Sequence, residues 1–225
     1  MDALSVVVFG ATGMVGSGVL AECLGDPRVR SVLVVGRTPC GVSHPKLREV
    51  VRSDLLDWSD AAADLGGLDA CFFCLGVSSF GMSEADYRRV TYDITVAAAT
   101  ALAALNPGMT FCYVSGEGTD SSASGRVMWA RVKGETENRL LAMPLNAAMF
   151  RPGLIRPVGG ARSKTRVYRA VYAVLGPLFP LLQRLLPRHV TTTAALGRAM
   201  ILAAMGRCPK RALENPDINA LAAAG

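Results

Sequence analysis

Histidine, aromatic residues and clustered charge are all scarce in this chain. Only two of the 225 residues are histidines, and aromatic residues make up 6%. His44 and His189 stand apart, so no group of ligands with the spacing of a zinc site is present and we expect no metal. The formal net charge is +6, but the densest basic stretch, residues 162–169, lacks the interleaved aromatic residues of a surface for single-stranded nucleic acid. We therefore expect no nucleic-acid partner, while the basic balance fits an anionic small ligand.

The six cysteines do not suggest a disulfide-linked, secreted domain. Most of them lie inside apolar runs, and we expect no secretory signal because the first residues already have the pattern of a strand. Free thiols in a reducing cytoplasm are the simplest interpretation. Cys71 and Cys74 form a CxxC motif, but a strand would direct the two side chains to opposite faces, which argues against a redox or zinc role.

No apolar run reaches the roughly 18 residues of a membrane span. The nearest approach, VYAVLGPLFPLLQRLLP at residues 171–187, is interrupted by prolines and polar residues. Contact with a membrane surface through residues 167–187 stays open as an alternative. We favour a broken helix pair that covers a pocket or makes a dimer contact.

Short apolar runs alternate with helical patterns along most of the chain. This alternation is typical of the α/β class, in which helices cross over between parallel strands. Helices are predicted at about residues 83–105, 126–142 and 191–205. No repeat or linker divides the chain, so we expect residues 1–225 to form a single domain. The predicted strands are residues 4–9, 31–35, 48–52, 69–75, 109–114 and 146–150.

A glycine-rich loop follows the first predicted strand. Residues 10–16, GATGMVG, carry glycines in a GxxGxxG spacing and lead into a helical pattern. A tight turn and a close backbone approach need glycine, and the free N–H groups at a helix N-terminus bind pyrophosphate. The order strand, turn, helix therefore predicts a dinucleotide site. The residues expected to contact the cofactor here are Gly10, Thr12, Gly13, Met14, Val15 and Gly16.

The residue after the second strand indicates which dinucleotide is bound. Arg37 follows VVG, where such domains place either an acid for the ribose hydroxyls or a base for a 2′-phosphate. We therefore expect NADP, with NADPH preferred over NADH, and Thr38 could add a hydroxyl contact. A solvated surface arginine is the alternative. Residues after the third and fourth strands are expected to reach the adenine and the rest of the cofactor, namely Asp54, Leu55, Leu75 and Gly76.

In their order, these segments resemble the short-chain dehydrogenase/reductase superfamily, and more narrowly its atypical, epimerase-like NAD(P)-binding branch. The resemblance rests on GATGMVG, the position of Asp54, CLG, the YVS end of the fifth strand and FRPG after the sixth, which span about residues 4–155. The rest of the chain, including HVTTTAALGRAMILAA, is similar to bacterial epimerase-like proteins and to Tat-interacting-protein-like oxidoreductases.

The resemblance implies a Rossmann-type, doubly wound parallel sheet in the order 3-2-1-4-5-6, with room for a seventh strand and with helices on both faces. It implies that residues 1–151 form the NADP(H)-binding core and that residues 152–225 form a small C-terminal subdomain, packed on that core, for the substrate. It also places Arg151, Pro152 and Gly153 of FRPG at the cofactor.

A catalytic group made of a serine and a Tyr-x-x-x-Lys pair is a further implication of the resemblance. Ser115 in YVSG matches the serine, and Lys133 in RVKGE matches the lysine. The tyrosine position, four residues earlier on the same helix face, holds Trp129. An indole can fill the volume and donate one hydrogen bond, but it cannot exchange a proton near neutral pH. We therefore expect cofactor binding to survive where the usual proton donor is missing.

Other groups could supply that proton, from the strand of Ser115, from the helix beside the cofactor or from the C-terminal part. Structural packing or surface exposure is the alternative interpretation for each of them. The glycine- and serine-rich residues 116–126 are expected to form a mobile loop over the site. The candidate proton donors are Tyr113, Tyr87, Tyr92 and His189.

Three functions stay open from the sequence alone. The favoured one is an NADP(H)-dependent oxidoreductase or epimerase-like enzyme that acts on an unknown small carbonyl or hydroxyl substrate. The second is a non-catalytic NADP(H)-binding sensor or regulatory protein. The third is a scaffold for a membrane surface or a protein partner, built around residues 167–187. We also expect a cytoplasmic protein, and the helices at 83–105 and 126–142 could pair in a homodimer.

Overall fold

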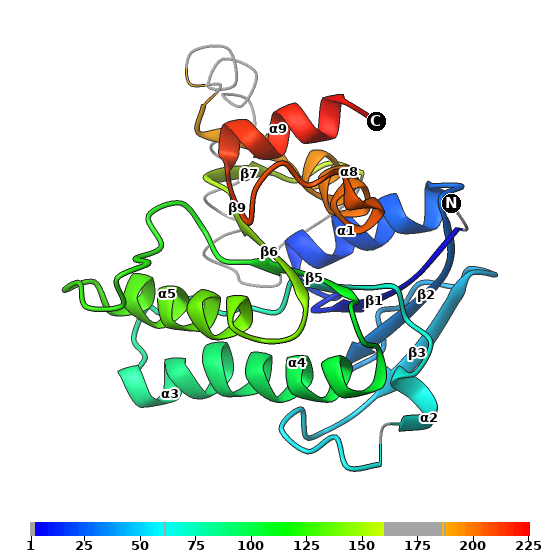
Figure 1. Ribbon diagram of the computed structural model, residues 1–225, viewed down its shortest axis with the longest axis horizontal. Helices are drawn as coiled ribbons and strands as arrows, with labels where there is room; N and C mark the ends of the chain where they lie inside the picture. Colours follow the sequence, from blue (N-terminus) through cyan, green and yellow to red (C-terminus); the bar gives the residue numbers. More distant parts are fainter. Residues whose placement is uncertain (1–2, 61, 160–185, 187) are drawn as a thin grey trace.

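A parallel sheet of seven strands forms the centre of the molecule in the order β3-β2-β1-β4-β5-β6-β9 (Figure 1). The computed structural model describes residues 3–60, 62–159, 186 and 188–225. The Rossmann-type prediction is confirmed, including its strand order, and the seventh strand comes from the C-terminal part. The strands are β1 Leu4–Phe9, β2 Val29–Gly36, β3 Leu47–Val51, β4 Ala70–Phe73, β5 Thr110–Val114, β6 Asn146–Arg151 and β9 Ala212–Glu214.

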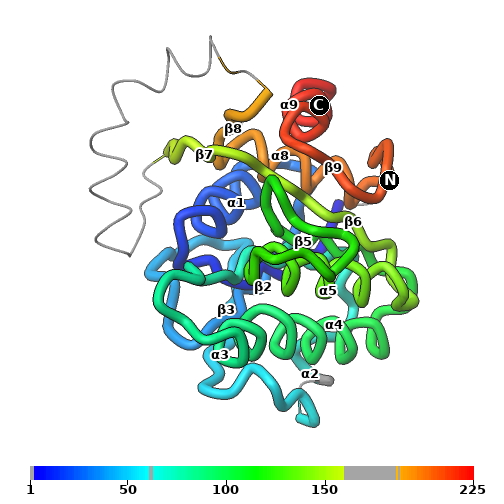
Figure 2. The backbone as a smooth tube through the Cα atoms, turned by 90° about the vertical axis from the view of Figure 1, so that its left-hand side faces the viewer, coloured from blue at the N-terminus to red at the C-terminus, as the bar shows by residue number. Residues whose placement is uncertain are grey.

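Helices cover both faces of this sheet, as Figures 1 and 2 show. One face carries α1 Met14–Gly25, α8 Thr193–Leu202 and α9 Asn215–Ala223. The other face carries α4 Ile94–Leu105 and α5 Met128–Leu141. The helix predicted at 83–105 consists of α3 Glu84–Arg88, the π-helical turn η1 Arg89–Asp93 and α4 in succession. Among the described residues, the remaining elements are α2 Ala62–Leu65, η3 Ala203–Arg207 and a small separate sheet of β7 Leu154–Arg156 with β8 Val190–Thr192.

Alternate side chains of each strand point into two separate apolar cores, as expected for strands that are buried on both faces. Val6 and Val8 of β1 belong to the core under α1 and α8, whereas Val7 and Phe9 belong to the core under α4. The CxxC motif is split in the same way: Cys71 lies in the second core and Cys74 packs against the first. Both thiols are free.

The C-terminal part is joined to the core by the sheet and by helix packing. Strand β9 pairs with β6 in parallel, from Met149 with Ala212 to Arg151 with Glu214. Helix α8 contacts α1 and α9. The elements after residue 186 are therefore built onto the sheet edge and onto the helix that follows the glycine-rich loop.

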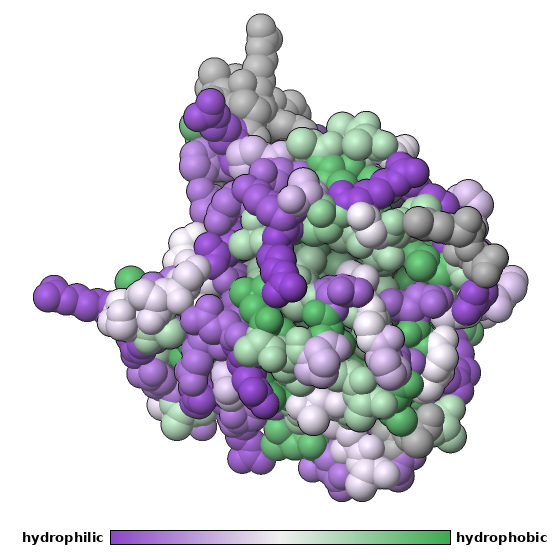
Figure 3. All heavy atoms as spheres, viewed as in Figure 1, coloured by the Kyte–Doolittle hydropathy of each residue, from purple (hydrophilic) through white to green (hydrophobic). Residues whose placement is uncertain are grey.

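The surface in the view of Figure 1 mixes hydrophobic and hydrophilic residues, and hydrophobic ones gather around α4 (Figure 3). Within the part of the chain that the structure describes, no helix is both long enough and apolar enough to span a bilayer. The segment predicted for membrane or partner contact, residues 167–187, lies outside the described residues apart from Leu186.

Candidate functional site

A cleft of about 1290 Å³ opens at the carboxyl ends of the parallel strands. Residues that follow β1, β2, β4, β5 and β6 line it, so one continuous cavity crosses the middle of the sheet. In doubly wound sheets ligands bind at this edge, where the strand order reverses. Strand β1 lies between β2 and β4, and the reversal therefore falls at the glycine-rich loop.

The glycine-rich loop turns sharply from β1 into α1. Gly10 has a φ of +79°, in the left-handed region that favours glycine, and its carbonyl accepts the Gly13 N–H at 2.9 Å. A Cβ on Gly16 would lie 2.2 Å from the Gly10 carbonyl oxygen, so no larger residue fits there. Helix α1 begins at Met14 with no acidic residue in its first turn. Its first N–H groups are therefore available to an anion in the cleft.

The segment after β2 closes one end of the cleft. Arg37 and Thr38 are both exposed and both line the cavity. After β3, Leu55 lines the cavity, whereas Asp54 does not. The Asp54 carboxylate accepts the Leu56 N–H at 2.8 Å, a hydrogen bond within its own turn. Of the two residues predicted to contact the cofactor here, Leu55 lies at the cleft and Asp54 does not.

The segment after β4 forms the floor of the cleft beside the glycine-rich loop. Leu75 and Gly76 both line the cavity, as does Cys74. A Cβ on Gly10 would lie 2.7 Å from the Leu75 N and 2.8 Å from Cys74 C and O, so the two loops touch backbone to backbone. Burial raises the pKa of the Cys74 thiol to about 12, which leaves it protonated and unreactive at neutral pH.

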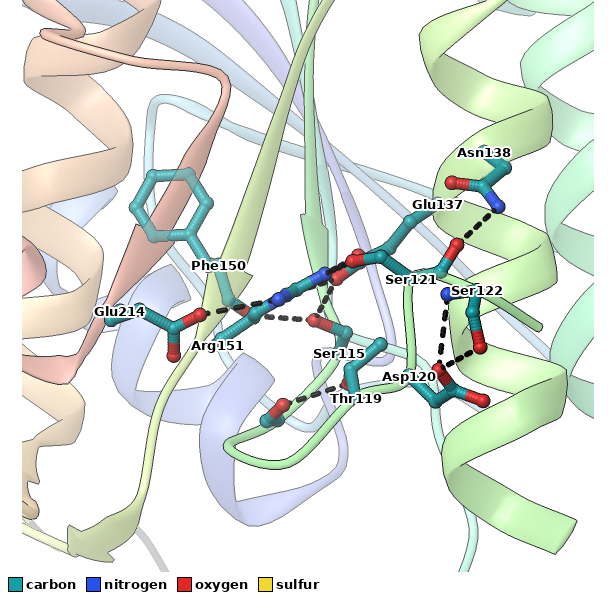
Figure 4. A network of polar contacts seen from close by, with 11 residues as sticks. Ser115, Thr119, Asp120, Ser121, Ser122, Glu137, Asn138, Phe150, Arg151 and Glu214 are labelled. Atoms are coloured by element: carbon teal, nitrogen blue, oxygen red, sulfur yellow. Dashed lines mark hydrogen bonds and ion pairs between the residues drawn. The ribbon is translucent and has the colours of Figure 1, made fainter. Parts of the chain in front are cut away.

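A buried ion pair holds the hydroxyl of Ser115 (Figure 4). Ser115 lines the cleft at the end of β5, and its hydroxyl donates to Glu137 Oε1 at 2.6 Å. Arg151 donates to the same carboxylate through Nε at 3.0 Å and through a second nitrogen. The Glu137 side chain is 2% exposed and the Arg151 side chain 13%, and Arg151 also reaches Glu214 at 3.2 Å. Arg151 therefore pairs with acidic side chains of the protein and does not line the cleft, where it had been predicted to contact the cofactor.

Lys133 extends from α5 to the cleft wall. Its ammonium group donates to the carbonyl oxygen of Ser115, which fixes it beside the end of β5. Burial lowers the pKa of Lys133 to about 8, against the opposing influence of Glu137 one helical turn away. The structure therefore brings Ser115 and Lys133 together at the cleft, as the sequence predicted.

Trp129 lies on the same helix face but outside the cleft lining. A Cβ on Gly118 would be 3.7 Å from Trp129 Cη2, so the indole edge lies against the loop that follows β5. That loop belongs to residues 116–126, which were predicted to be mobile, and it contains several internal hydrogen bonds. Asp120 accepts the N–H groups of Ser122, Ser124 and Gly125 at 2.7–3.2 Å.

The turn after β6 faces the loop after β5 across the cleft. Pro152 and Gly153 line the cavity, and the Pro152 carbonyl accepts the Glu117 N–H at 2.9 Å. Glu117 also lines the cavity, and its Oε1 lies 2.5 Å from Nδ1 of His189. This carboxylate and imidazole therefore meet at the end of the cleft opposite Arg37.

None of the tyrosines that the structure describes lines the cleft. Tyr113 is 1% exposed within the core, where burial raises its pKa, and Tyr87 is 2% exposed. The ring of Tyr92 has the guanidinium of Arg88 stacked over it at 4.2 Å. Of the four candidate proton donors, His189 is hydrogen-bonded to a residue that lines the cleft, Glu117.

Sequence reasoning gave no role to Glu117 or Glu137. Each was detectable: Glu117 stands two residues after Ser115, and Glu137 stands four after Lys133 on the same helix face. Because Ser115 and Lys133 were already assigned to a site, acidic residues two or four positions away were candidates for the same site. The sequence could not show that one faces the cleft and the other the interior.

Comparison with known proteins agrees with this geometry. Residues 6–118 match the model of the NAD dependent epimerase/dehydratase family. The chain is 28% identical over 224 residues to fmp52-2, a mitochondrial protein of Aspergillus terreus, and the match covers 95% of each of the two chains. It is 32% identical over 176 residues to fmp52-1, a mitochondrial protein of the same fungus, covering 74% of this chain and 72% of the relative.

Solved structures share the fold at low sequence identity. A UDP-N-acetylglucosamine 4-epimerase of Methanobrevibacter ruminantium superposes with a TM-score of 0.68 at 18% identity, over 94% of this chain and 76% of that one. A short-chain dehydrogenase of Burkholderia cenocepacia in complex with NADP gives a TM-score of 0.65 at 14% identity, over 94% and 87% of the two chains.

The cytoplasmic location expected from the sequence is contradicted by the names of both fungal relatives, which are mitochondrial proteins. The prediction rested on free thiols, which do not separate one reducing compartment from another. The family, by contrast, is settled by the matched residues together with the glycine-rich loop and the strand order. The chain belongs to the NAD dependent epimerase/dehydratase family, within the epimerase-like branch of the short-chain dehydrogenase/reductase superfamily.

Proposed function

We propose that the protein binds NADP(H) and uses it to oxidise or reduce a small hydroxyl or carbonyl substrate. The observation that carries this proposal is the single cleft that runs from Arg37, past the glycine-rich loop, to Ser115 and Lys133. One end offers a guanidinium and a hydroxyl, the middle offers backbone N–H groups, and the other end offers titratable side chains. A dinucleotide needs these three environments in this order.

The residues of the cleft fit the cofactor in detail. The α1 N-terminus has its first-turn N–H groups free for a pyrophosphate, and Gly16 keeps the loop narrow enough for close approach. Arg37 and Thr38 would hold the 2′-phosphate, and Lys133 would hold the ribose at the other end. A bound nicotinamide would supply or accept the hydride. Arg151, in contrast, donates hydrogen bonds to Glu137, so we do not include it among the cofactor contacts.

The cofactor preference follows from charge at the end of β2. An arginine there attracts the phosphate that distinguishes NADP from NAD, and a guanidinium can bind it through two parallel hydrogen bonds. Titration calorimetry with NADPH and with NADH tests this. Binding of neither cofactor would overturn the proposal, and tighter binding of NADH would overturn the role of Arg37.

A matched pair of variants sharpens that titration. Arg37→Ala is expected to weaken NADPH about 10-fold or more, because a charge-assisted pair with phosphate contributes roughly 1.5–3 kcal/mol. NADH affinity should be unchanged. Arg207→Ala is the control, since Arg207 is also exposed but lies at the end of η3, outside the cleft. Equal weakening by both changes would point to general charge rather than to a phosphate site.

The second candidate is an NADP(H) sensor without catalysis. It is favoured by Trp129 at the tyrosine position and by the lack of tyrosine among the described residues of the cleft. For both functions, we assign cofactor binding to residues 1–151. Residues 152–225 would bind the substrate of an enzyme or change shape in a sensor. A homodimer through α4 and α5, and a scaffold role of residues 167–187, remain predictions that need solution measurements.

A further inference from the structure

We propose that Glu117 and His189 form a proton relay at the substrate end of the cleft. The Glu117 carboxyl exchanges a proton with the substrate oxygen, and His189 exchanges that proton with water. This inference rests on the NADP(H)-dependent function proposed above and names the group that takes the place of the missing tyrosine. Three sets of contacts carry it.

The first set fixes Glu117 at the cleft. Residues Gly116–Thr119 form a tight turn, closed by the Thr119 N–H on the Gly116 carbonyl at 3.2 Å, with Gly118 at a φ of +83°. These values match a turn that needs glycine at its third position. The Glu117 N–H is tied to Pro152 at 2.9 Å across the cleft. The backbone of Glu117 is thus held by Pro152 and its side chain by His189, and the residue lines the cavity.

The second set connects Glu117 to water. Its Oε1 lies 2.5 Å from His189 Nδ1, so a hydrogen bond joins the two side chains. The side chain of His189 is 56% exposed and that of Glu117 is 41% exposed. Imidazole is the side chain best suited to pass protons near neutral pH. The pair therefore spans the distance from the cleft to solvent.

The third set concerns other proton-bearing groups of the cleft. The hydroxyl hydrogen of Ser115 is given to Glu137, whose charge Arg151 already balances. The Cys74 thiol stays protonated, and arginine does not release its proton in proteins. Lys133 donates to the Ser115 carbonyl, and we assign its ammonium group to the ribose.

The chemistry balances with one reduced nicotinamide as the reductant. Hydride goes to the carbonyl carbon, the π pair of the C=O bond moves to oxygen, and an O–H bond forms with the proton of the Glu117 carboxyl. Glu117 recovers a proton from His189 Nδ1, and His189 takes one from water. In the oxidative direction the Glu117 carboxylate is the base and the proton leaves through His189. General acid catalysis of this kind is typically worth about 10² to 10⁴ in rate.

The position of Trp129 fits this arrangement. The indole edge lies against Gly118, on the turn that presents Glu117. The residue that replaces the tyrosine thus packs under the loop that carries the substitute acid.

The first test observes the pair without cofactor or substrate. The chain has only two histidines, so a His44→Gln variant with ¹⁵N-labelled histidine gives imidazole signals from His189 alone. We expect a proton bound to Nδ1 and shifted downfield by the hydrogen bond to Glu117. It should disappear in the further variant Glu117→Gln. A His189 spectrum that Glu117→Gln leaves unchanged would overturn the relay.

The second test measures NADPH oxidation with 4-nitrobenzaldehyde and 9,10-phenanthrenequinone as carbonyl probes. Glu117→Gln should lower kcat about 100-fold or more while the Kd for NADPH and the melting temperature stay constant. The double variant with His189→Gln should lose no more than the single one, because groups that act as a unit are not additive. Formate should restore part of the rate to Glu117→Ala.

The matched control is Glu84→Gln, which removes an exposed carboxylate that pairs with Arg131 outside the cleft. It should change neither rate nor the His189 signal. Full activity in Glu117→Gln, or no formate rescue, would overturn the relay while NADPH binding stands. Loss of NADPH binding by the unmodified protein would instead overturn the proposed function, and calorimetry separates these two failures. If Glu117→Gln does not fold, Glu117→Asp keeps the acid and should retain more activity than Glu117→Ala.

Discussion

The hydroxyl of Ser115 donates to the buried carboxylate of Glu137 at 2.6 Å. The serine that the sequence assigned to the substrate is therefore oriented by an acid two helical turns beyond the tyrosine position. Because Arg151 holds the same carboxylate from β6, this contact ties β5, α5 and β6 together behind the cleft wall.

Removal of the Glu137 carboxylate should destabilise the protein strongly. Glu137→Leu leaves the guanidinium of Arg151 buried with only its weaker partners, and a broken buried pair typically costs about 3–5 kcal/mol. Urea unfolding of the protein without cofactor measures this. The control is Glu135→Leu, because Glu135 pairs with Arg88 at 38% exposure, where an ion pair contributes about 0–1 kcal/mol. The double variant Glu137→Leu, Arg151→Met should be more stable than Glu137→Leu alone; a larger loss would contradict the argument.

Two glycines of the same helix should respond oppositely to alanine. A Cβ on Gly16 would lie 2.2 Å from the Gly10 carbonyl oxygen, whereas a Cβ on Gly25 meets nothing within 4 Å. Gly16→Ala must displace the loop and should abolish measurable NADPH binding. Gly25→Ala should bind normally and be as stable as the parent or slightly more so, since alanine favours helix. Calorimetry and thermal melts decide, and normal binding by Gly16→Ala would contradict the tight-loop geometry.

Lys133 should react as an amine at unusually low pH. Burial lowers its pKa to about 8, so half of its amine is uncharged near pH 8, while an ordinary lysine reaches that point near pH 10.4. Acetylation followed by mass spectrometry should give a half-maximal extent of Lys133 modification near pH 8. A lysine-containing peptide in the same tube serves as the control. NADPH should protect Lys133, and modification that rises only above pH 10 would rule out the lowered pKa.

Gly153 should tolerate no side chain. A Cβ there would lie 2.4 Å from the His189 carbonyl oxygen and 2.5 Å from Glu117 Oε2. Gly153→Ala is expected to push the two proton-exchanging residues apart, with loss of the Nδ1 proton signal of His189. Gly76→Ala is the comparison, because Gly76 also lines the cleft but has no atom within 4 Å of its added Cβ. If Gly153→Ala kept the signal, the close packing around Glu117 would be refuted.

Sequence patterns predicted the fold well because its main signals are local and repeated. Consecutive apolar residues in β1 and β4 indicated strands buried on both faces, and the glycines of the first loop indicated the turn into α1. Strand β9 was allowed but not placed, since Ala212–Glu214 is too short for a periodic signal. It forms because β6 offers an edge, which is a tertiary cause.

The candidate site was predicted less completely, for a physical reason. The pairing of Ser115 with Lys133 follows from matched positions, and the structure brings both to the cleft. The partner of Ser115 could not be inferred, because Glu137 is chosen by the direction of a side chain and by the burial of Arg151. The same holds for Glu117 and His189, which lie 72 positions apart and meet only after β8 is placed beside β7.

The pairing of β6 with β9 also has a consequence for synthesis of the chain. Arg151 and Glu214 are 63 positions apart, so β6 leaves the ribosome long before the strand that covers its edge. An uncovered edge can pair with the edge of another nascent chain. Truncations before Ala212 leave this edge open and also remove Leu213, Ile218 and Leu221 from the core, so the expected phenotype is aggregation during synthesis together with a less stable fold.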